Sequence, residues 1–156
     1  MSYILSPAGV RGASLGIRVD RATAALPQTA TGSIFTVSGG RIVLTSLVGE
    51  VTTALGATAT TVTVVSTPTT GAATTLASAT AVTSSAVGSW LTLPATLGSA
   101  LVVTPVAGAV ALPSASLGLL VPVGSIQITT SASDTGSVKW SMTYVPFDDA
   151  ATVAAA

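Results

Sequence analysis

The sequence contains no cysteine and no histidine, and these two absences exclude several kinds of chemistry. Without cysteine there is no disulfide framework, no thiolate nucleophile and no sulfur ligand for a metal. Without histidine the chain lacks the usual general base at neutral pH and the commonest metal ligand. Asparagine is absent as well, so no N-glycosylation acceptor exists.

Charge is also scarce. Charged residues make up 6% of the 156 residues, five positive against five negative, where an ordinary domain has roughly 25%. Residues 51–133 carry no charge at all. The high apolar content and zero net charge are the reverse of a disordered composition. A neutral surface lacks the repulsion that keeps many monomers apart, so we expect self-association.

The few charges are unevenly placed along the chain. Residues 1–41 hold four arginines and one aspartate, a net charge of +3, and the remainder holds one lysine and four acids, a net charge of −3. Complementary ends on a neutral body favour contacts with a partner, and the candidate contacts are Arg11, Arg18, Arg21 and Arg41. Four arginines without interleaved aromatic residues do not indicate nucleic-acid binding.

The longest apolar stretch, residues 100–123, is long enough to cross a bilayer as a helix. Pro105, Pro113 and Pro122 fall within it, and each removes a helical hydrogen bond. No lysine or arginine lies near either end to set an orientation. The proline spacing favours short strands separated by turns, so we expect no membrane association.

Residue alternation predicts β-structure elsewhere. In residues 137–144, Val138, Trp140, Met142 and Tyr144 alternate with polar side chains, which is typical of a strand with one buried face. Residues 126–129 alternate similarly, and the turn residues 133–136 predict a hairpin between the two segments.

A second hairpin is predicted over residues 33–51, around the turn Ser38-Gly39-Gly40. Its second strand, residues 41–48, alternates less cleanly, as a strand covered on both faces would.

The uncharged middle of the chain continues the same pattern. Val62 and Val64 alternate with threonines, and residues 67–71 are predicted to form a turn. Short strands are predicted over residues 75–82 and 89–94, the first of which could instead be a loop that passes over a neighbour. Helix is indicated only weakly, at residues 21–26 and in the alanine-rich C-terminus. We therefore predict an all-β, single-domain antiparallel β-sandwich or β-barrel with a short C-terminal tail. Residues 1–32, rich in glycine, proline and arginine, are predicted to form an extended N-terminal arm, and residues 33–156 the β-rich domain.

No catalytic constellation is present. Asp148 and Asp149 are adjacent, so in extended chain they point to opposite sides and offer a cation at most weak ligands. The glycines of residues 9–16 match neither the dinucleotide fingerprint nor the phosphate-binding loop. Trp90, Trp140, Tyr3 and Tyr144 are typical core or interface anchors. We expect no enzymatic activity, no metal, no cofactor and no small-molecule substrate.

Two segments carry a resemblance to a known class of protein. The runs IFTVSGGRIVLTSLVGEVTTAL and VPVGSIQITTSASDTGSVKWSMTYVPFDDAATVAAA, with the uncharged Thr/Ala/Val body between them, resemble small virion structural proteins of tailed bacteriophages, most of all capsid decoration (cement) proteins. The resemblance covers residues 33–156 and includes no catalytic motif. It implies a β-rich protein, often trimeric, located on the outer capsid of the virion and assembled in the host cytoplasm. The implied partner is the major capsid protein.

Two other functions remain open at this point. One is a different virion part, such as a tail tube, minor tail or fibre protein. The other is a cell-surface or carbohydrate-binding β-module, which the shortage of aromatic, acidic and amide side chains disfavours. A neutral Thr/Val/Ala surface suits a capsid protein because it is buried without the desolvation cost that charges impose.

Overall fold

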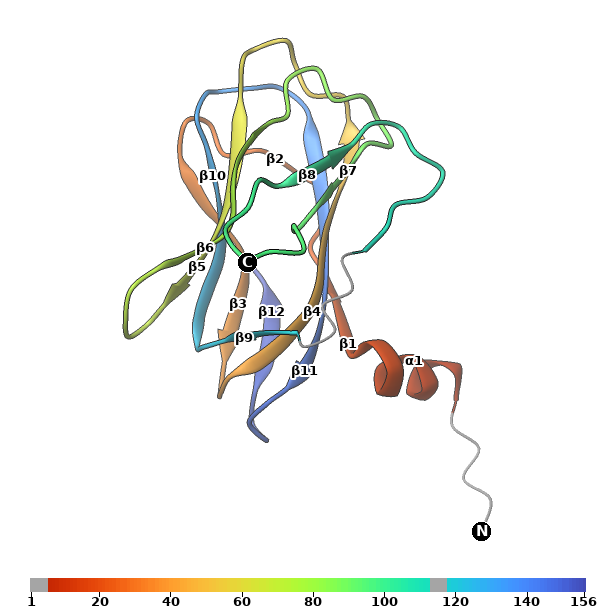
Figure 1. The fold of residues 1–156 in the computed structure, drawn as a ribbon, viewed down its shortest axis with the longest axis vertical. Coiled ribbons are helices and arrows are strands. Elements are labelled where there is room, and N and C mark those ends of the chain that lie inside the picture. The colour runs from red at the N-terminus through yellow and green to blue at the C-terminus, as the bar shows by residue number, and fades with distance from the viewer. Residues whose placement is uncertain (1–5, 113–117) are drawn as a thin grey trace.

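Two antiparallel β-sheets, stacked face to face, make up most of the computed structural model, which describes residues 6–112 and 118–156 (Figure 1). Apolar side chains from both sheets form one continuous core between them. The predicted all-β fold is confirmed, and of the two expected architectures it is the sandwich. Within the described residues, no helix has the length and apolar character to cross a membrane.

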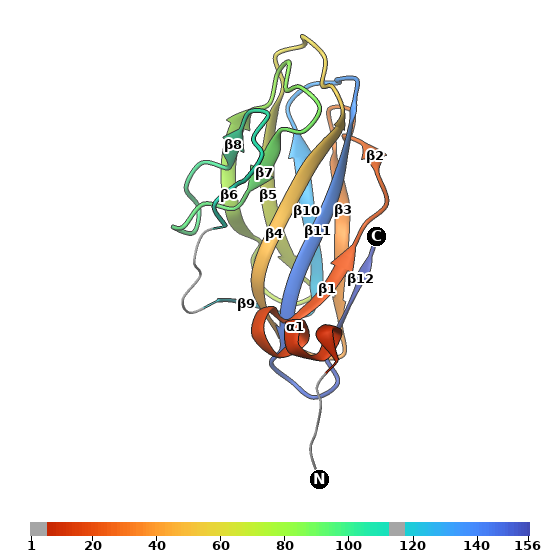
Figure 2. The same ribbon diagram turned by 90° about the vertical axis from the view of Figure 1, so that its right-hand side faces the viewer.

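Sheet A is the larger of the two. It consists of β1 Ile17–Asp20, β2 Ala24–Ala25, β4 Ile42–Thr53, β7 Trp90–Thr92, β8 Val102–Thr104, β9 Leu119–Val121 and β11 Ser137–Pro146. The strand order is β1-β11-β4-β7-β8, with β2 also paired to β11 and β9 to β4. Figure 2 shows the outer side of this sheet, with β4, β11 and β1 side by side.

Sheet B covers the other side of the core. It consists of β3 Thr31–Ser38, β5 Thr61–Pro68, β6 Thr74–Ala81, β10 Gly124–Thr130 and β12 Thr152–Ala155. The strand order is β12-β3-β10-β5-β6. The alanine-rich C-terminus is therefore a strand at the edge of this sheet, and the weakly indicated helix there is wrong.

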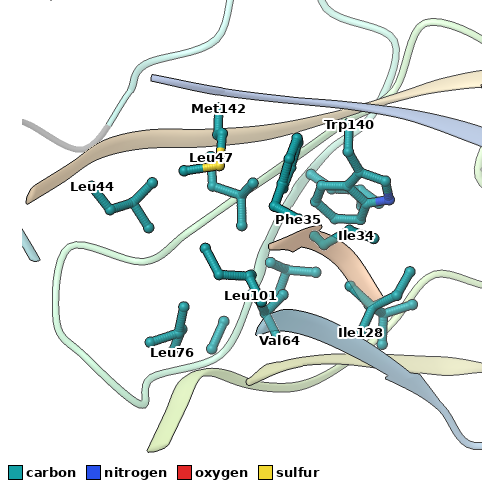
Figure 3. Packing of buried hydrophobic residues seen from close by; sticks show 14 of the residues in the cluster. Ile34, Phe35, Leu44, Leu47, Val64, Leu76, Leu101, Ile128, Trp140 and Met142 are labelled. Carbon is teal, nitrogen blue, oxygen red and sulfur yellow. The ribbon is translucent and has the colours of Figure 1, made fainter. Parts of the chain in front are cut away.

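The alternation in residues 137–144 correctly predicts both a strand and its buried face. Val138, Trp140, Met142 and Tyr144 of β11 are all buried, while the residues between them are partly exposed. Figure 3 shows Trp140 and Met142 packed among leucine, isoleucine, valine and phenylalanine side chains of the opposite sheet, of the neighbouring strand β4 and of connecting segments. Burying large apolar side chains of this kind contributes about 1.5–3 kcal/mol each.

The two predicted hairpins are wrong in the same way. The segment after β10 carries the chain from sheet B to β11 in sheet A, and residues 39–41 carry it from β3 in sheet B to β4 in sheet A. In each case the strands are present but lie on opposite sides of the core. Alternation shows which side chains face the core, and strands that face it from opposite sheets satisfy that pattern equally well.

β5 and β6, by contrast, do pair as a hairpin. The turn predicted around residues 67–71 separates these strands, and Val62 and Val64 are both buried, as their alternation indicates. The strand predicted over residues 89–94 corresponds to β7.

The irregular alternation near residue 45 has a different cause from the one predicted. Ser46 pairs with Thr143 and Leu44 pairs with Tyr144, so Thr45 is an extra residue in β4. Such a β-bulge shifts the alternation by one residue. Leu44 and Leu47 are consequently both buried, although they are three positions apart.

The β-rich domain begins earlier than the predicted boundary at residue 33. β1 pairs with β11 from Ile17 onward, β2 pairs with the start of β11, and Leu26 is part of the core. The weakly indicated helix over residues 21–26 is therefore wrong. At the N-terminal end of the described chain, the residues before Ile17 precede the first strand.

These residues include a short helix, α1 Pro7–Leu15. Ser6 caps its first turn by accepting a hydrogen bond from the Gly9 N–H at 3.1 Å, and Pro7 occupies the first helical turn, where no N–H is needed. The helix ends at Gly16, whose φ of 91° and close approach to the Tyr144 carbonyl exclude a side chain. The described part of the predicted extended arm therefore contains a helix, which the glycine joins to sheet A, and the two strands β1 and β2 of that sheet.

Candidate functional site

The outer face of sheet B carries no charge, because none of its five strands contains a charged residue. Its outward side chains alternate with the buried valines and isoleucines, and nearly all of them are hydroxyls. We call this surface the threonine face and define it by Thr31, Ser33, Thr36, Thr61, Thr63, Val65, Thr67, Ser125, Gln127 and Thr129.

Half of the side chains that define the threonine face bond to one another. The hydroxyls of Thr31 and Thr129 lie 2.7 Å apart. Gln127 accepts a hydrogen bond from the Thr67 hydroxyl at 2.9 Å, and its own amide donates to Ser33 at 3.4 Å. Because these donors and acceptors are already partnered, removing water from the face costs less than it would for isolated polar groups.

A hollow of about 350 Å³ lies at one end of the threonine face. Thr36, Thr67 and Ser125 line it, together with the ends of β3 and β5 and the start of β10. It offers a recess for a side chain of whatever covers the face.

The outer face of sheet A has the opposite character. Every charged residue that lies on a strand is found here, namely Arg18, Asp20, Glu50 and Lys139. Arg18 donates to Asp20 at 2.8 Å. A hydrogen bond from Ser141, followed by the bond from Arg18, lowers the pKa of Asp20 below its usual value. The sandwich therefore has one neutral face and one charged face.

The four candidate arginines have different surroundings. Arg18 pairs with Asp20, Arg41 pairs with Asp148, and Arg21 donates to the carbonyl of Ala156 at 2.8 Å. Arg11 lies in α1, but its side chain is outside the described part of the structure. The structure does not bring the four together, and their contact with a partner stays a prediction.

Asp148 closes a corner where the turn before β4 meets the turn before β12. Arg41 donates to both of its carboxylate oxygens from the guanidinium, at 2.9 Å each, and from its backbone N–H at 2.7 Å. These bonds lower the pKa of Asp148 to about 2. The Arg41 guanidinium also lies 4.7 Å from the centre of the Phe147 ring.

This pairing bears on the cation site considered for Asp148 and Asp149. The Asp148 carboxylate already accepts three hydrogen bonds from one arginine, which makes it a poor cation ligand. Among the residues that the structure describes, no three acidic, histidine or cysteine side chains cluster closely enough to hold a metal ion.

Comparison with known proteins adds little. No protein-family model matches the chain, and no curated protein matches it. One solved structure, of the infectious bursal disease virus Gx strain, is similar over 88% of this chain and 28% of its own, at 12% identity and a TM-score of 0.26. A likeness at that TM-score carries no argument about this chain, which spans less than a third of that one.

Sequence reasoning missed the grouping on sheet A. β-pairing places Lys139 opposite Glu50, and Glu50 opposite Trp90, in one row across three strands. These residues are far apart in the sequence, and no local pattern links them. The threonine face, by contrast, has a visible signal in the alternating threonines of residues 61–67.

Proposed function

We propose that this protein is a structural component of a tailed-bacteriophage virion. It binds the outer surface of the capsid and stabilises contacts between subunits of the major capsid protein. The observation that carries this proposal is the uncharged threonine face, on which half of the side chains bond to one another. We propose no catalytic role for it.

The size of the threonine face suits this role. The five strands of sheet B, four of seven or eight residues and one of four, cover roughly 550 Å² from the usual strand spacing and rise, and a stable interface buries about 800 Å² on each partner. The face therefore supplies most of one interface, and the adjoining loops supply the rest. Charged residues, which are depleted at the centre of interfaces, are absent from it.

The N-terminal helix offers a second contact. α1 exposes Val10 and Leu15, at 50% and 58%, and projects from the lower end of sheet A (Figure 2). We propose that this helix lies against a neighbouring subunit, and we favour a homotrimer, as in the decoration proteins that the chain resembles.

A matched pair of charge insertions tests the role of the threonine face. Thr36→Asp places a carboxylate at an exposed position of that face, and Thr53→Asp places one at an exposed position of β4 in sheet A. A buried carboxylate without a partner costs about 3–5 kcal/mol, so Thr36→Asp should weaken attachment to capsids more than about a hundredfold. Thr53→Asp should leave attachment unchanged, and both variants should melt near the wild-type temperature.

The measurement is co-sedimentation of the purified variants with capsids that lack the protein, supported by negative-stain images of virions with and without it. Equal attachment of both variants would show that the threonine face is not the docking surface. Density on the tail and none on the capsid would replace the decoration role with a tail or fibre role. Light scattering of the free protein reports the oligomeric state.

A further inference from the structure

The outer face of sheet A contains a hollow of about 360 Å³. Its floor is formed by side chains of β1, β11, β4 and β7, and Val110 and Leu112 form part of its rim. Figure 2 shows this side of the molecule, with β7, β8 and the segment that follows them beside β4. The volume lies within the roughly 300–1,000 Å³ of typical small-molecule sites.

The β-register arranges the floor of the hollow in rows. In one row Lys139 lies opposite Glu50, and Glu50 lies opposite Trp90. In another row Thr143 lies between Arg18 and Ser46. Cations, a carboxylate, hydroxyls and an aromatic ring are thus held within one hollow on a rigid sheet.

Glu50 and Lys139 are only partly satisfied by the protein. Both side chains are half-buried, yet neither forms an ion pair or a hydrogen bond with any residue that the structure describes. Trp90 is half-buried as well, and its indole N–H donates to the Ala107 carbonyl at 3.1 Å, which fixes the ring in place. The hollow therefore presents an acceptor, a donor and an anchored aromatic ring to whatever enters it.

The chemistry of these groups restricts the ligand. A simple anion would be repelled by the Glu50 carboxylate, and a simple cation would be repelled by Lys139 and Arg18. An apolar ligand would remove water from several charges without replacing their hydrogen bonds, which is costly. A polyol avoids all three problems because each hydroxyl both donates and accepts.

We propose that this hollow binds a neutral saccharide of one or two rings. Glu50 accepts hydrogen bonds from sugar hydroxyls, and Lys139 donates to the adjacent oxygens. The apolar C–H face of the sugar packs against Trp90. This site lies on the sheet opposite to the threonine face, so it stays open when that face is covered, and it does not rest on the proposed virion role.

The experiment uses the purified full chain and intrinsic tryptophan fluorescence. Trp140 is buried in the core, whereas Trp90 lines the hollow, so binding should change the emission of Trp90 alone. The probes are glucose, galactose, N-acetylglucosamine and their disaccharides, with glycine as a zwitterion and sulfate as an anion. We expect saturable binding of at least one saccharide and none of glycine or sulfate.

Variants locate the site. Glu50→Gln should weaken saccharide binding at least about tenfold, because a charge-assisted hydrogen bond becomes a neutral one. Trp90→Phe should weaken binding and remove most of the fluorescence change, so calorimetry measures its affinity. Thr129→Ala, on the threonine face, should bind as the wild type does, and thermal melting confirms that each variant is folded.

Three outcomes would overturn the proposal. The first is the absence of saccharide binding by the folded protein at concentrations up to about 100 mM, a range in which even weak association is seen. The second is binding of glycine or sulfate in preference to every sugar. The third is saccharide binding that neither Glu50→Gln nor Trp90→Phe affects, which would place it elsewhere on the surface.

Discussion

Two buried threonines have hydroxyls in contrasting surroundings. Thr60 and Thr130 are 0% and 3% exposed. The Thr130 hydroxyl donates to the Pro27 carbonyl and also lies 3.4 Å from the Ala30 carbonyl oxygen. The Thr60 hydroxyl has no hydrogen-bond partner among the described residues. Replacing each threonine with valine exchanges the hydroxyl for a methyl group of similar size.

The same substitution should therefore have opposite effects at the two sites. Thr130→Val removes a made hydrogen bond and leaves a carbonyl without its donor, which should lower the free energy of unfolding by about 1–3 kcal/mol. Thr60→Val removes a buried hydroxyl that has no hydrogen-bond partner in the folded state. It should therefore raise the free energy of unfolding, by up to about 1–3 kcal/mol.

Thermal and urea unfolding of the two variants and the wild type measure this difference. For a domain of this size, 1 kcal/mol corresponds to about 2–4 °C in melting temperature. We expect Thr60→Val to melt above the wild type and Thr130→Val below it. If Thr60→Val is destabilised as strongly as Thr130→Val, its hydroxyl has a partner, and our reasoning about that site is wrong.

Three further predictions follow from other parts of the molecule. Gly49→Ala should lower the free energy of unfolding by about 1–3 kcal/mol in urea melts, because a Cβ there would lie 2.9 Å from the Trp140 ring. Asp148 has its pKa lowered from 3.8 to about 2, so its bonds to Arg41 stabilise the fold above pH 3.8 and are lost as the pH falls through about 2. Asp148→Asn should therefore lose less stability than the wild type as the pH falls from 4 to 2. A urea midpoint that falls by the same amount in both proteins over that range would contradict this. Deleting residues 1–15 removes α1 but leaves every strand, so the melting temperature should change little while attachment to capsids weakens; undiminished co-sedimentation would show that the helix makes no contact.

Alternation in the sequence identifies individual strands well, and the clearest case is β11. Alternate side chains of a strand lie on the same face because the backbone is pleated. The positions of Val138, Trp140 and Met142 therefore predict the buried face of β11 whichever strands lie beside it. Pairing is different because it depends on residues elsewhere in the chain. The sequence around residues 133–136 has the composition of a tight turn, yet the chain there crosses from one sheet to the other.

The N-terminal helix had a local signal that composition obscured. Ser6 followed by Pro7 is a common way to begin a helix, and Gly16 is a common way to end one. The three glycines of residues 9–16 instead favoured an extended arm. Gly9 and Gly12 lie inside α1 and Gly16 lies at its end, and the helix persists because its first turn is capped and its last residue is followed by a glycine with a positive φ.

The division into a neutral and a charged face arises from the order in which strands enter the two sheets. The chain passes repeatedly between sheets, so the uncharged middle of the sequence supplies β5, β6 and β10 to sheet B and β7 and β8 to the edge of sheet A. The charged strands come from the two ends of the sequence and meet as the neighbours β1, β11 and β4. Pairing between distant segments therefore gathers Arg18, Glu50 and Lys139 on one surface and leaves the opposite surface without charge. A molecule built in this way has one face that loses water at little cost and one that keeps it, which is the asymmetry required of a protein that attaches by one side and remains solvated on the other.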